Sequence, residues 1–484
     1  RREALLRQRF EQQRAEREAE RQRELEAEAA RIEARLREEL AASPDASGAD
    51  DAGFMRDAEA LFEEQAAEAG GVDLETEVWK HLRGHLGGEI GYRFYGYFSP
   101  SRQPEGERVL DQGRLLLRYR VALSEAIELL VAPRLRFDDG GLSRKVQSGV
   151  VDDEPRRPVL SFEEALVRGS WGTLDLEFGE KIFAFGSADL YNPTDLIWPV
   201  DYTDLLDSEK IGVPALHLAW WPGGGDTALR LVWLPWFVPS RLPLPGERFF
   251  AFAPSRALPP VRERDLPPRT LGAGEFVVRA ESRLAGFDVS LTSYYGWHRL
   301  PVLEPLTTAS PPFVALEPRY TRRLVLGADF AREVGDFILA GELAQTFSES
   351  SEQDDFLQYV FGARRTFFPW DRRMTLSLEY AGEWTTAQAQ GEAITVVTDL
   401  ARAFKAALLT RVRFEPVDDL DLTLAGAWLL HGPDSFYVRP EARYHFGAHT
   451  ELRLGLDLID GRPGGFFDRF GDDDRVFVDV KVVF

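Results

Sequence analysis

The chain ends on the stretch R-V-F-V-D-V-K-V-V-F, residues 475–484, which alternates along its whole length. Successive side chains of a strand point to opposite faces. One face is therefore entirely apolar, formed by Val476, Val478, Val480, Val482 and Phe484. The opposite face carries Asp479 and Lys481. This pattern suits a strand between lipid and water, although the last strand of a soluble β-sandwich could show it too.

The same alternation recurs from Leu86 to the C-terminus, as in the run Leu452, Leu454, Leu456, Leu458. Including weaker stretches, the pattern predicts roughly 18 strands of the length that a tilted membrane strand needs. We expect these four leucines to face outward, with Arg453 and Asp457 facing inward.

The connections between these strands alternate between short and long. Ser124-Glu125 and Ala285-Gly286 are short, whereas 183–208 and 237–269 are long. The connections of a soluble β-sandwich need not alternate in length, whereas outer-membrane barrels have short periplasmic turns and long outer loops. Tryptophans near both kinds of connection fit two interfacial girdles: Trp171 and Trp370 at short turns, and Trp233, Trp236, Trp297, Trp384 and Trp428 near long loops. The sequence therefore predicts a closed antiparallel transmembrane β-barrel of about 18 strands over residues 86–484.

An α-helical N-terminal region is expected to precede the barrel on the periplasmic side. Residues 1–40 hold eleven Arg and eleven Glu, many spaced i,i+4, which predicts a charged helix or a weak coiled coil. It could dock onto an inner-membrane or periplasmic transporter, or associate with copies of itself. Residues 41–85 read as a linker with short helices.

Overall composition narrows the class of protein further. The net charge is −22, which argues against nucleic acid as a partner. The absence of cysteine excludes a thiolate metal site, a disulfide framework and a lipid-attached N-terminal Cys. No apolar run is long enough for a transmembrane helix. Because the first residues do not resemble a signal peptide, an outer-membrane protein with this numbering would be the mature form.

The residues between the apolar positions should line the interior. On this register the wall carries eighteen basic and fourteen acidic side chains. So many charges require a wet lumen. The basic excess could select anions, or the charges could simply pair across strands and stiffen the wall. The predicted selectivity residues are Arg93, Arg118, Arg120, Arg134, Arg136, Arg230, Arg279, Arg283, Arg411, Arg413, Arg439 and Arg443.

The acidic surplus lies in long loops, in groups such as Asp152-Asp153-Glu154 and Asp472-Asp473-Asp474. These groups could bind divalent cations that bridge to lipopolysaccharide, or could only solvate the loops. No other cofactor is expected, and outer-membrane lipid would surround the barrel.

The connection 183–208 is the most distinctive, because it combines turn formers with large apolar residues that an outer loop would not expose without cause. We expect 187–207 to fold inward and form a constriction, bending at Asn192-Pro193. The alternative is that it packs over the outer rim. The predicted constriction residues are Asp189, Asn192, Pro193, Asp195, Trp198, Asp201 and Asp204.

This stretch resembles a motif of a largely uncharacterised proteobacterial outer-membrane barrel family that is associated with RND-type exporters and distantly similar to alginate-export channels. The matching positions are Gly186, Asp189, Asn192-Pro193, Asp195 and Gly212-Val213-Pro214, with Phe185 in place of the family's Trp. The terminal strand likewise resembles the recognition strand of Gram-negative outer-membrane barrels. The resemblance implies a transport or export pore in that membrane.

No catalytic motif is present: the chain lacks a Gly-x-Ser-x-Gly elbow and a Walker loop. His81 and His85 are spaced i,i+4, but they fit the polar face of a short helix better than a metal site. The sequence therefore predicts no enzyme and no metal centre. It favours a porin-like or export channel for a small or elongated, anionic solute. The alternative is the outer-membrane exit of a trans-envelope export complex, docked through the N-terminal helix.

Overall fold

The computed structural model describes residues 85–100, 108–147, 149, 151–244, 247–250, 264–309, 312–390 and 397–484. The expected helix over 1–40 and nearly all of the expected linker region 41–85 lie outside these ranges. Both remain predictions.

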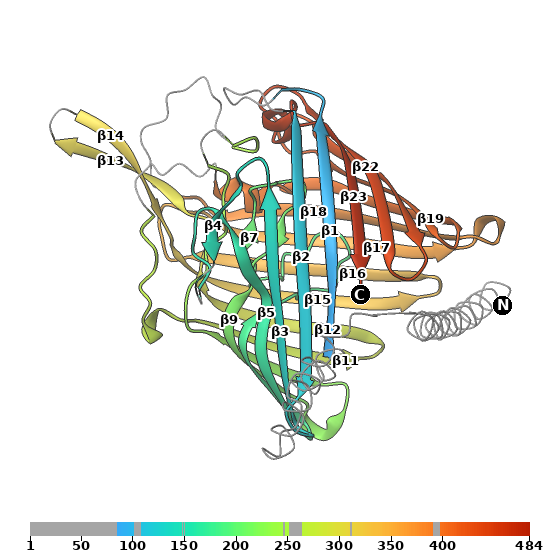
Figure 1. Ribbon diagram of the computed structural model, residues 1–484. Coiled ribbons are helices and arrows are strands. Elements are labelled where there is room, and N and C mark those ends of the chain that lie inside the picture. The colour runs from blue at the N-terminus through green and yellow to red at the C-terminus, as the bar shows by residue number, and fades with distance from the viewer. Residues whose placement is uncertain are drawn as a thin grey trace, which may run out of the picture. The chain divides into compact units, whose positions relative to one another are not determined.

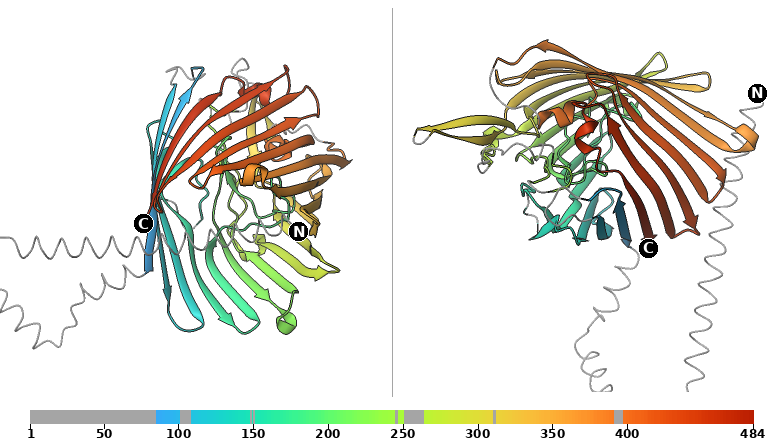
Figure 2. Two further views of the ribbon diagram at one scale, coloured as in Figure 1. Left: turned by 90° about the vertical axis from the view of Figure 1, so that its right-hand side faces the viewer. Right: turned by 90° about the horizontal axis from the view of Figure 1, so that it is seen from above.

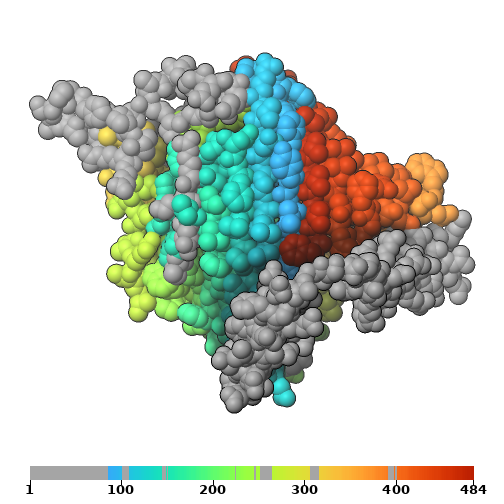
Figure 3. Space-filling view, viewed as in Figure 1, coloured from blue at the N-terminus to red at the C-terminus, as the bar shows by residue number. Residues whose placement is uncertain are grey.

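The described residues form one large antiparallel sheet whose first and last strands pair, from Glu89 opposite Val483 to Tyr97 opposite Arg475. Figure 1 shows this wall, and Figure 3 shows the first strand, in blue, against the last strands, in red. The sheet has 19 strands, of which 18 close into the barrel. The predicted 18-stranded barrel is confirmed.

The barrel strands, in chain order, are β1 (Leu86–Tyr97), β2 (Val109–Ala122), β3 (Ile127–Asp138), β5 (Arg157–Trp171), β6 (Leu174–Lys181), β9 (Val213–Trp220), β10 (Ala228–Leu234), β11 (Glu275–Leu284), β12 (Phe287–Trp297), β15 (Arg322–Val334), β16 (Phe337–Ser348), β17 (Asp355–Phe367), β18 (Arg373–Ala387), β19 (Ala406–Val417), β20 (Leu420–Leu429), β21 (Ser435–Phe446), β22 (Thr450–Gly461) and β23 (Arg475–Val483).

The remaining elements lie in the connections. β4 (Ser143–Gln147) runs parallel to β5, and β7 (Val200–Asp201) pairs with β8 (Glu209–Lys210). β13 (Val302–Ala309) and β14 (Pro312–Arg319) form a hairpin that projects from the wall in Figures 1 and 2. The 3₁₀ helices are η1 (Pro222–Gly224), η2 (Leu271–Ala273), η3 (Pro369–Asp371), η4 (Thr398–Arg402) and η5 (Phe467–Phe470). Within the described ranges, no helix has the length and apolar character to cross a membrane.

The strand register follows the sequence pattern. Leu454 is 44% exposed on the outer face, whereas Asp457 is fully buried inside and Arg453 donates at 2.9 Å to Asp479, its neighbour on the inner face of β23. Phe178 and Leu291 are about two-thirds exposed, as lipid-facing side chains must be in a protein without its membrane. The predicted orientation of the wall is confirmed.

The short turns lie together at one end of the wall. The link Ala285-Gly286 between β11 and β12 has positive φ at both residues, 51° and 81°. Two positive φ values match the right-handed twist of a tight hairpin, and glycine adopts them without a steric cost.

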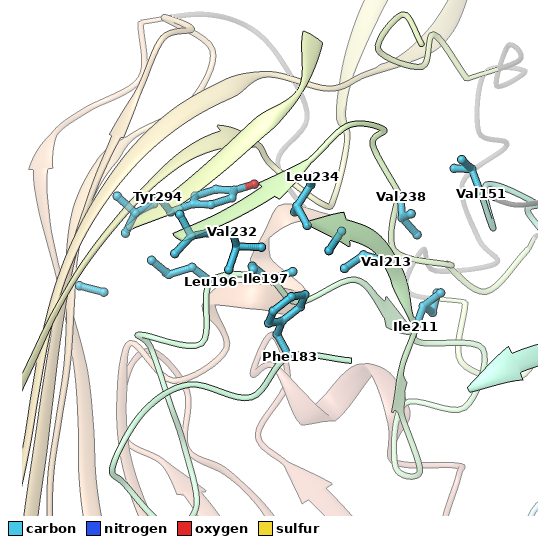
Figure 4. Packing of buried hydrophobic residues seen from close by; sticks show 14 residues of the cluster. Val151, Phe183, Leu196, Ile197, Ile211, Val213, Val232, Leu234, Val238 and Tyr294 are labelled. Carbon is cyan, nitrogen blue, oxygen red and sulfur yellow. The ribbon is translucent and has the colours of Figure 1, made fainter. Parts of the chain in front are cut away.

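The long connection between β6 and β9 lies inside the wall, where the view from above in Figure 2 shows it in green. We call residues 182–212 the inward segment. Figure 4 shows its Phe183, Leu196 and Ile197 packed among Val213 and Val232 of the wall. A second cluster joins Tyr191 to inward-facing apolar residues of β17–β22, such as Val360 and Leu409. The barrel interior therefore contains apolar cores between the inward segment and the wall.

These interior clusters overturn two expectations about aromatic residues. Trp236, expected in the outer girdle, packs against the cluster of Figure 4. The spacing of Phe404, Leu408, Val412 and Phe414 predicts one lipid-facing row, but the ring centre of Phe404 lies 5.0 Å from that of Tyr191 inside the barrel. Both residues sit beside strand ends where the chain turns inward, so the strand alternation does not extend to them. Trp171, Trp370, Trp384 and Trp428 are exposed, as expected.

Candidate functional site

Two carboxylates of the wall hold the first half of the inward segment. Glu342 of β16 accepts hydrogen bonds from the backbone N–H groups of Ser187 (2.7 Å), Ala188 (2.8 Å) and Thr194 (3.0 Å). Glu379 of β18 accepts hydrogen bonds from the backbone N–H groups of residues 189, 190 and 191, at 2.6–3.1 Å. Charge-assisted bonds of this kind satisfy backbone donors that would otherwise be buried without a partner.

The second half of the inward segment is held by arginines beside the closing seam of the barrel. Asp204 accepts from Arg475 of β23 at 2.7 Å. Asp207 accepts from Arg93 of β1 at 3.0 Å and contacts Arg439 of β21 at 3.4 Å. Burial alone would raise the pKa of Asp207, but the neighbouring guanidinium groups outweigh it and hold the pKa below its usual range.

The middle of the inward segment is also held by ion pairs. Asp201 accepts from Arg157 of β5 at 2.9 Å and from Arg241 at 2.6 Å. Burial acts to raise the pKa of Asp201, yet these two cations lower it well below the ordinary value. Asp195 pairs with Lys210 and also accepts from the backbone of Phe185.

Local conformation sets the bend of the segment. The N–H of Asp195 donates to the carbonyl of Asn192 at 3.1 Å, so residues 192–195 form a tight turn with Pro193 and Thr194 at its centre, one residue beyond the bend predicted at Asn192-Pro193. Gly186 has a φ of 103°, and a Cβ there would lie 2.5 Å from both Asn192 Oδ1 and Glu342 Oε1. Only glycine fits this position. Trp198 is half-buried.

The inward segment therefore contacts widely separated parts of the wall. Its partners lie on β1, β5, β16, β18, β21 and β23. These contacts place it across the lumen and not over the outer rim. All four predicted constriction aspartates, Asp189, Asp195, Asp201 and Asp204, make ion pairs there.

The described part of the connection between β10 and β11 adds a second layer. Ser240 accepts from the N–H of Val200, and Arg241 binds both Asp152 and Asp201. Phe249 packs against Phe470 in the second apolar cluster. The segment is thus held from the wall on one side and from this connection on the other.

The predicted selectivity arginines all face inward, but they divide into two groups. Those beside the inward segment are largely buried and ion-paired, so they act as structural charges: Arg93, Arg134, Arg136, Arg279 and Arg439. The others are more exposed and lie nearer the short turns: Arg118, Arg120, Arg230, Arg283, Arg411, Arg413 and Arg443.

In most of the exposed group, the arginines face water more than their acidic partners do. The exceptions are Arg230 and Arg283, whose side chains are about as exposed as those of Glu281 and Asp288. The side chain of Arg413 is 49% exposed and that of Asp421, its partner at 2.8 Å, is 11% exposed. Arg118 and Glu89 show the same difference, 46% against 14%. The interior surface that a solute would meet near the short turns is therefore richer in guanidinium groups than the count of charges suggests.

Strand alternation puts Glu342 and Glu379 among the inward-facing acidic residues of the wall, but it does not identify them as anchors of the segment. It also missed Arg475, Arg157 and Arg241, the main partners of the segment's aspartates. A signal for the inner core does exist, since L-V-W-L at 231–234 and L-L at 408–409 are apolar on both strand faces. Such a stretch indicates a second apolar partner opposite the lipid.

The acidic loops expected to bind cations are mostly engaged with arginines. Asp152 binds Arg241 and Asp473 binds Arg248. Among the described residues, no group of three or more candidate ligands could hold a metal ion. Binding of divalent cations or lipopolysaccharide at these loops stays a prediction.

Two histidines lie beside carboxylates in the lumen. His217 Nδ1 is 2.7 Å from Glu177, and His445 Nε2 is 3.4 Å from Asp421. Within the described ranges, no serine or threonine hydroxyl hydrogen-bonds to either ring. These pairs therefore lack the nucleophile that a hydrolytic triad requires.

No protein-family model and no curated protein match the chain. Among solved structures, it is similar to OccK9 (OpdG) of Pseudomonas aeruginosa, with a TM-score of 0.48 and 11% identity over 82% of this chain and 97% of that one. It is also similar to a BenF-like porin of Pseudomonas fluorescens, with a TM-score of 0.47 and 9% identity over 83% and 97% of the two chains. At such identities the likeness concerns the fold alone, and kinship with the exporter-associated family stays a prediction.

Proposed function

We propose that the protein is an outer-membrane channel that passes small anionic solutes, with the inward segment as its constriction. The closed wall satisfies its backbone hydrogen bonds internally, and its outer face presents large exposed apolar side chains such as Phe178 and Leu291. A protein of this kind requires a lipid environment. The short turns would lie on the periplasmic side.

The observation that carries the anionic preference is the difference in exposure between the lumen arginines and their acidic partners. Arg364, Arg411 and Arg413 of β17 and β19 have side chains 42–49% exposed. Their acidic partners Asp189 and Asp421 are 28% and 11% exposed. Since a charge acts most strongly on a solute that approaches it directly, this part of the lumen favours anions.

Reversal potentials in planar bilayers test this proposal. The purified full chain should conduct ions and prefer chloride over potassium at low salt. The preference should weaken toward 1 M salt, because the Debye length falls from about 10 Å at 0.1 M to about 3 Å. Replacing Arg364, Arg411 and Arg413 together by Gln should remove most of it.

The matched control is Arg462→Gln, which alters an outer-loop arginine whose side chain is 76% exposed. It should leave the reversal potential unchanged. A cation preference of the wild-type protein at low salt would reject the anionic lumen. Absence of conductance in a correctly folded barrel would reject the channel itself.

A further inference from the structure

A cavity of about 60 Å³ lies between the inward segment and the outer connections. Tyr191, Trp198 and Tyr202 of the segment line it on one side, and His298, Arg299 and Arg323 line it on the other. Since a single water needs roughly 10–15 Å³ of such space, the cavity has room for more than one water. It is large enough for a small polyatomic ion.

Arg299 lines this cavity, and one edge of its guanidinium group has no partner. The residue is only 4% exposed, and its Nη1 donates to Glu275 at 2.9 Å and to the carbonyl of Val238 at 3.1 Å. Its Nε and Nη2 have no hydrogen-bond partner among the described residues. These two N–H groups form the edge of a guanidinium that binds carboxylate or phosphate through two parallel hydrogen bonds.

Arg323 supplies a further unpaired donor. Its Nε is buried without a hydrogen-bond partner, and the side chain makes no ion pair with any described residue. Its guanidinium lies 5.5 Å from the ring centre of Tyr294, a contact that leaves the donor unsatisfied. Buried donors without an acceptor are rare in folded proteins, and a bound ligand is one explanation of them.

The charge around the cavity is positive. Its one lining carboxylate, Asp195, is already paired with Lys210, and Glu275 is occupied by the other edge of Arg299. Burial and the neighbouring arginines lower the pKa of His298 to about 3, so this ring is neutral at pH 7. Arg323 therefore has no carboxylate of its own in the lining, and Glu275, which attracts it from outside the lining, is already paired with Arg299.

We propose that this cavity binds one oxyanion, a carboxylate, phosphate or sulfate group, through Nε and Nη2 of Arg299 and Nε of Arg323. The site lies at the outer side of the inward segment, and Trp198 belongs to both. In the channel proposed above, on which this role rests, it would hold a solute by its anionic group beside the constriction. The chemistry is the same whether the group belongs to such a solute or to a free inorganic anion.

Isothermal titration of the purified full chain in detergent, at constant ionic strength in chloride, tests the site. Phosphate, sulfate and acetate are used as separate probes. We expect saturable binding of at least one of them at one site per chain. Binding of acetate would indicate a site for carboxylate solutes, whereas binding of phosphate or sulfate alone would indicate a site for those anions.

Two variants isolate the free donors. Arg323→Gln removes a cation that has no ion-pair partner, and Arg299→Lys keeps the charge beside Glu275 but removes the two-pronged edge. Each should weaken binding at least tenfold. Arg462→Gln, in an outer loop away from the cavity, should bind as the wild type does.

Absence of saturable binding by all three anions would overturn the site, as would unchanged affinity in a folded Arg323→Gln variant. Retention of the heat-modifiable electrophoretic mobility of the barrel checks that each variant is folded. Conductance is measured on the same preparations. A protein that conducts but binds no oxyanion rejects the site alone, whereas one that binds but does not conduct rejects the channel.

Discussion

Arg475 shows how the barrel interior tolerates a fully buried charge. Its Nε donates to Asp457 and its Nη1 to Asp204, both at 2.7 Å, and its guanidinium lies 4.0 Å from the ring centre of Tyr95. Two carboxylates and an aromatic face replace the water that the cation has lost. One of those carboxylates belongs to the inward segment, so a single side chain joins the last strand to the segment.

Removing this cation should be costly. Arg475→Ala would leave Asp457 and Asp204 buried with weaker neutralisation, and we expect a loss of about 3–5 kcal/mol in the free energy of unfolding. Arg462→Ala, which removes an exposed partner of Asp434, should cost about 0–1 kcal/mol. Urea unfolding followed by tryptophan fluorescence would measure both. Equal losses in the two variants would show that the buried network adds nothing to stability.

At the scale of elements, the inward segment depends on Glu342 and Glu379. Each accepts three backbone N–H groups, a pattern that a glutamine cannot reproduce because one of its two acceptor atoms becomes a donor. The double variant Glu342→Gln, Glu379→Gln should free the first half of the segment. We expect a larger and noisier single-channel current in a barrel that remains folded.

The control for this variant is Glu128→Gln. Glu128 pairs with Arg120 and Arg168 of the wall, so this substitution changes a wall carboxylate without altering the two that hold the segment. Its current should match that of the wild type. If the double variant also conducts as the wild type does, these carboxylates do not hold the constriction in place.

The pH dependence of the segment's other end follows from Asp207. Its pKa is lowered in the folded protein, by the cations that outweigh burial, relative to the usual value near 4. The stabilising contribution is therefore fully present above about pH 4 and is lost as pH falls through the lowered pKa. Single-channel current should be constant from pH 7 to pH 5 and should rise only below about pH 4.

Asp207→Asn removes this ion pair at every pH. At pH 7 it should already show the larger current that the wild type reaches only in acid. A wild-type current that rises between pH 7 and pH 5 would assign the response to a different group.

At the scale of the whole molecule, strand alternation predicted the wall because lipid imposes an apolar outer face on every strand. Leu454 and Asp457 have the expected orientations for this reason. The inner core could not be predicted in the same way, since residues such as Val232 and Leu409 are apolar only because a distant segment packs on them. Trp236 and Phe404 were assigned wrongly for the same cause.

The number of basic and acidic residues in the wall also gave an incomplete prediction of the charge in the lumen. Counting predicted a mildly basic wall, but the inward segment brings its own carboxylates to the buried arginines, as Asp207 does to Arg93 and Arg439. What remains for a solute is the exposed group near the short turns. Burial, which the count omits, decides which charges a solute meets.

Replacing residues 187–207 by a short Gly/Ser link tests this division of the barrel. The variant removes the layer that crosses the lumen but keeps the exposed arginines Arg364, Arg411 and Arg413. Single-channel conductance should rise several-fold, because the apolar segment no longer obstructs the lumen. Anion preference should persist at low salt, although a wider lumen would weaken it. Arg475 keeps Asp457 as a partner in the remaining wall, so the barrel itself should still close. Unchanged conductance in a folded variant would mean that the narrowest point lies elsewhere, and loss of the preference would place selectivity on the segment instead of the wall.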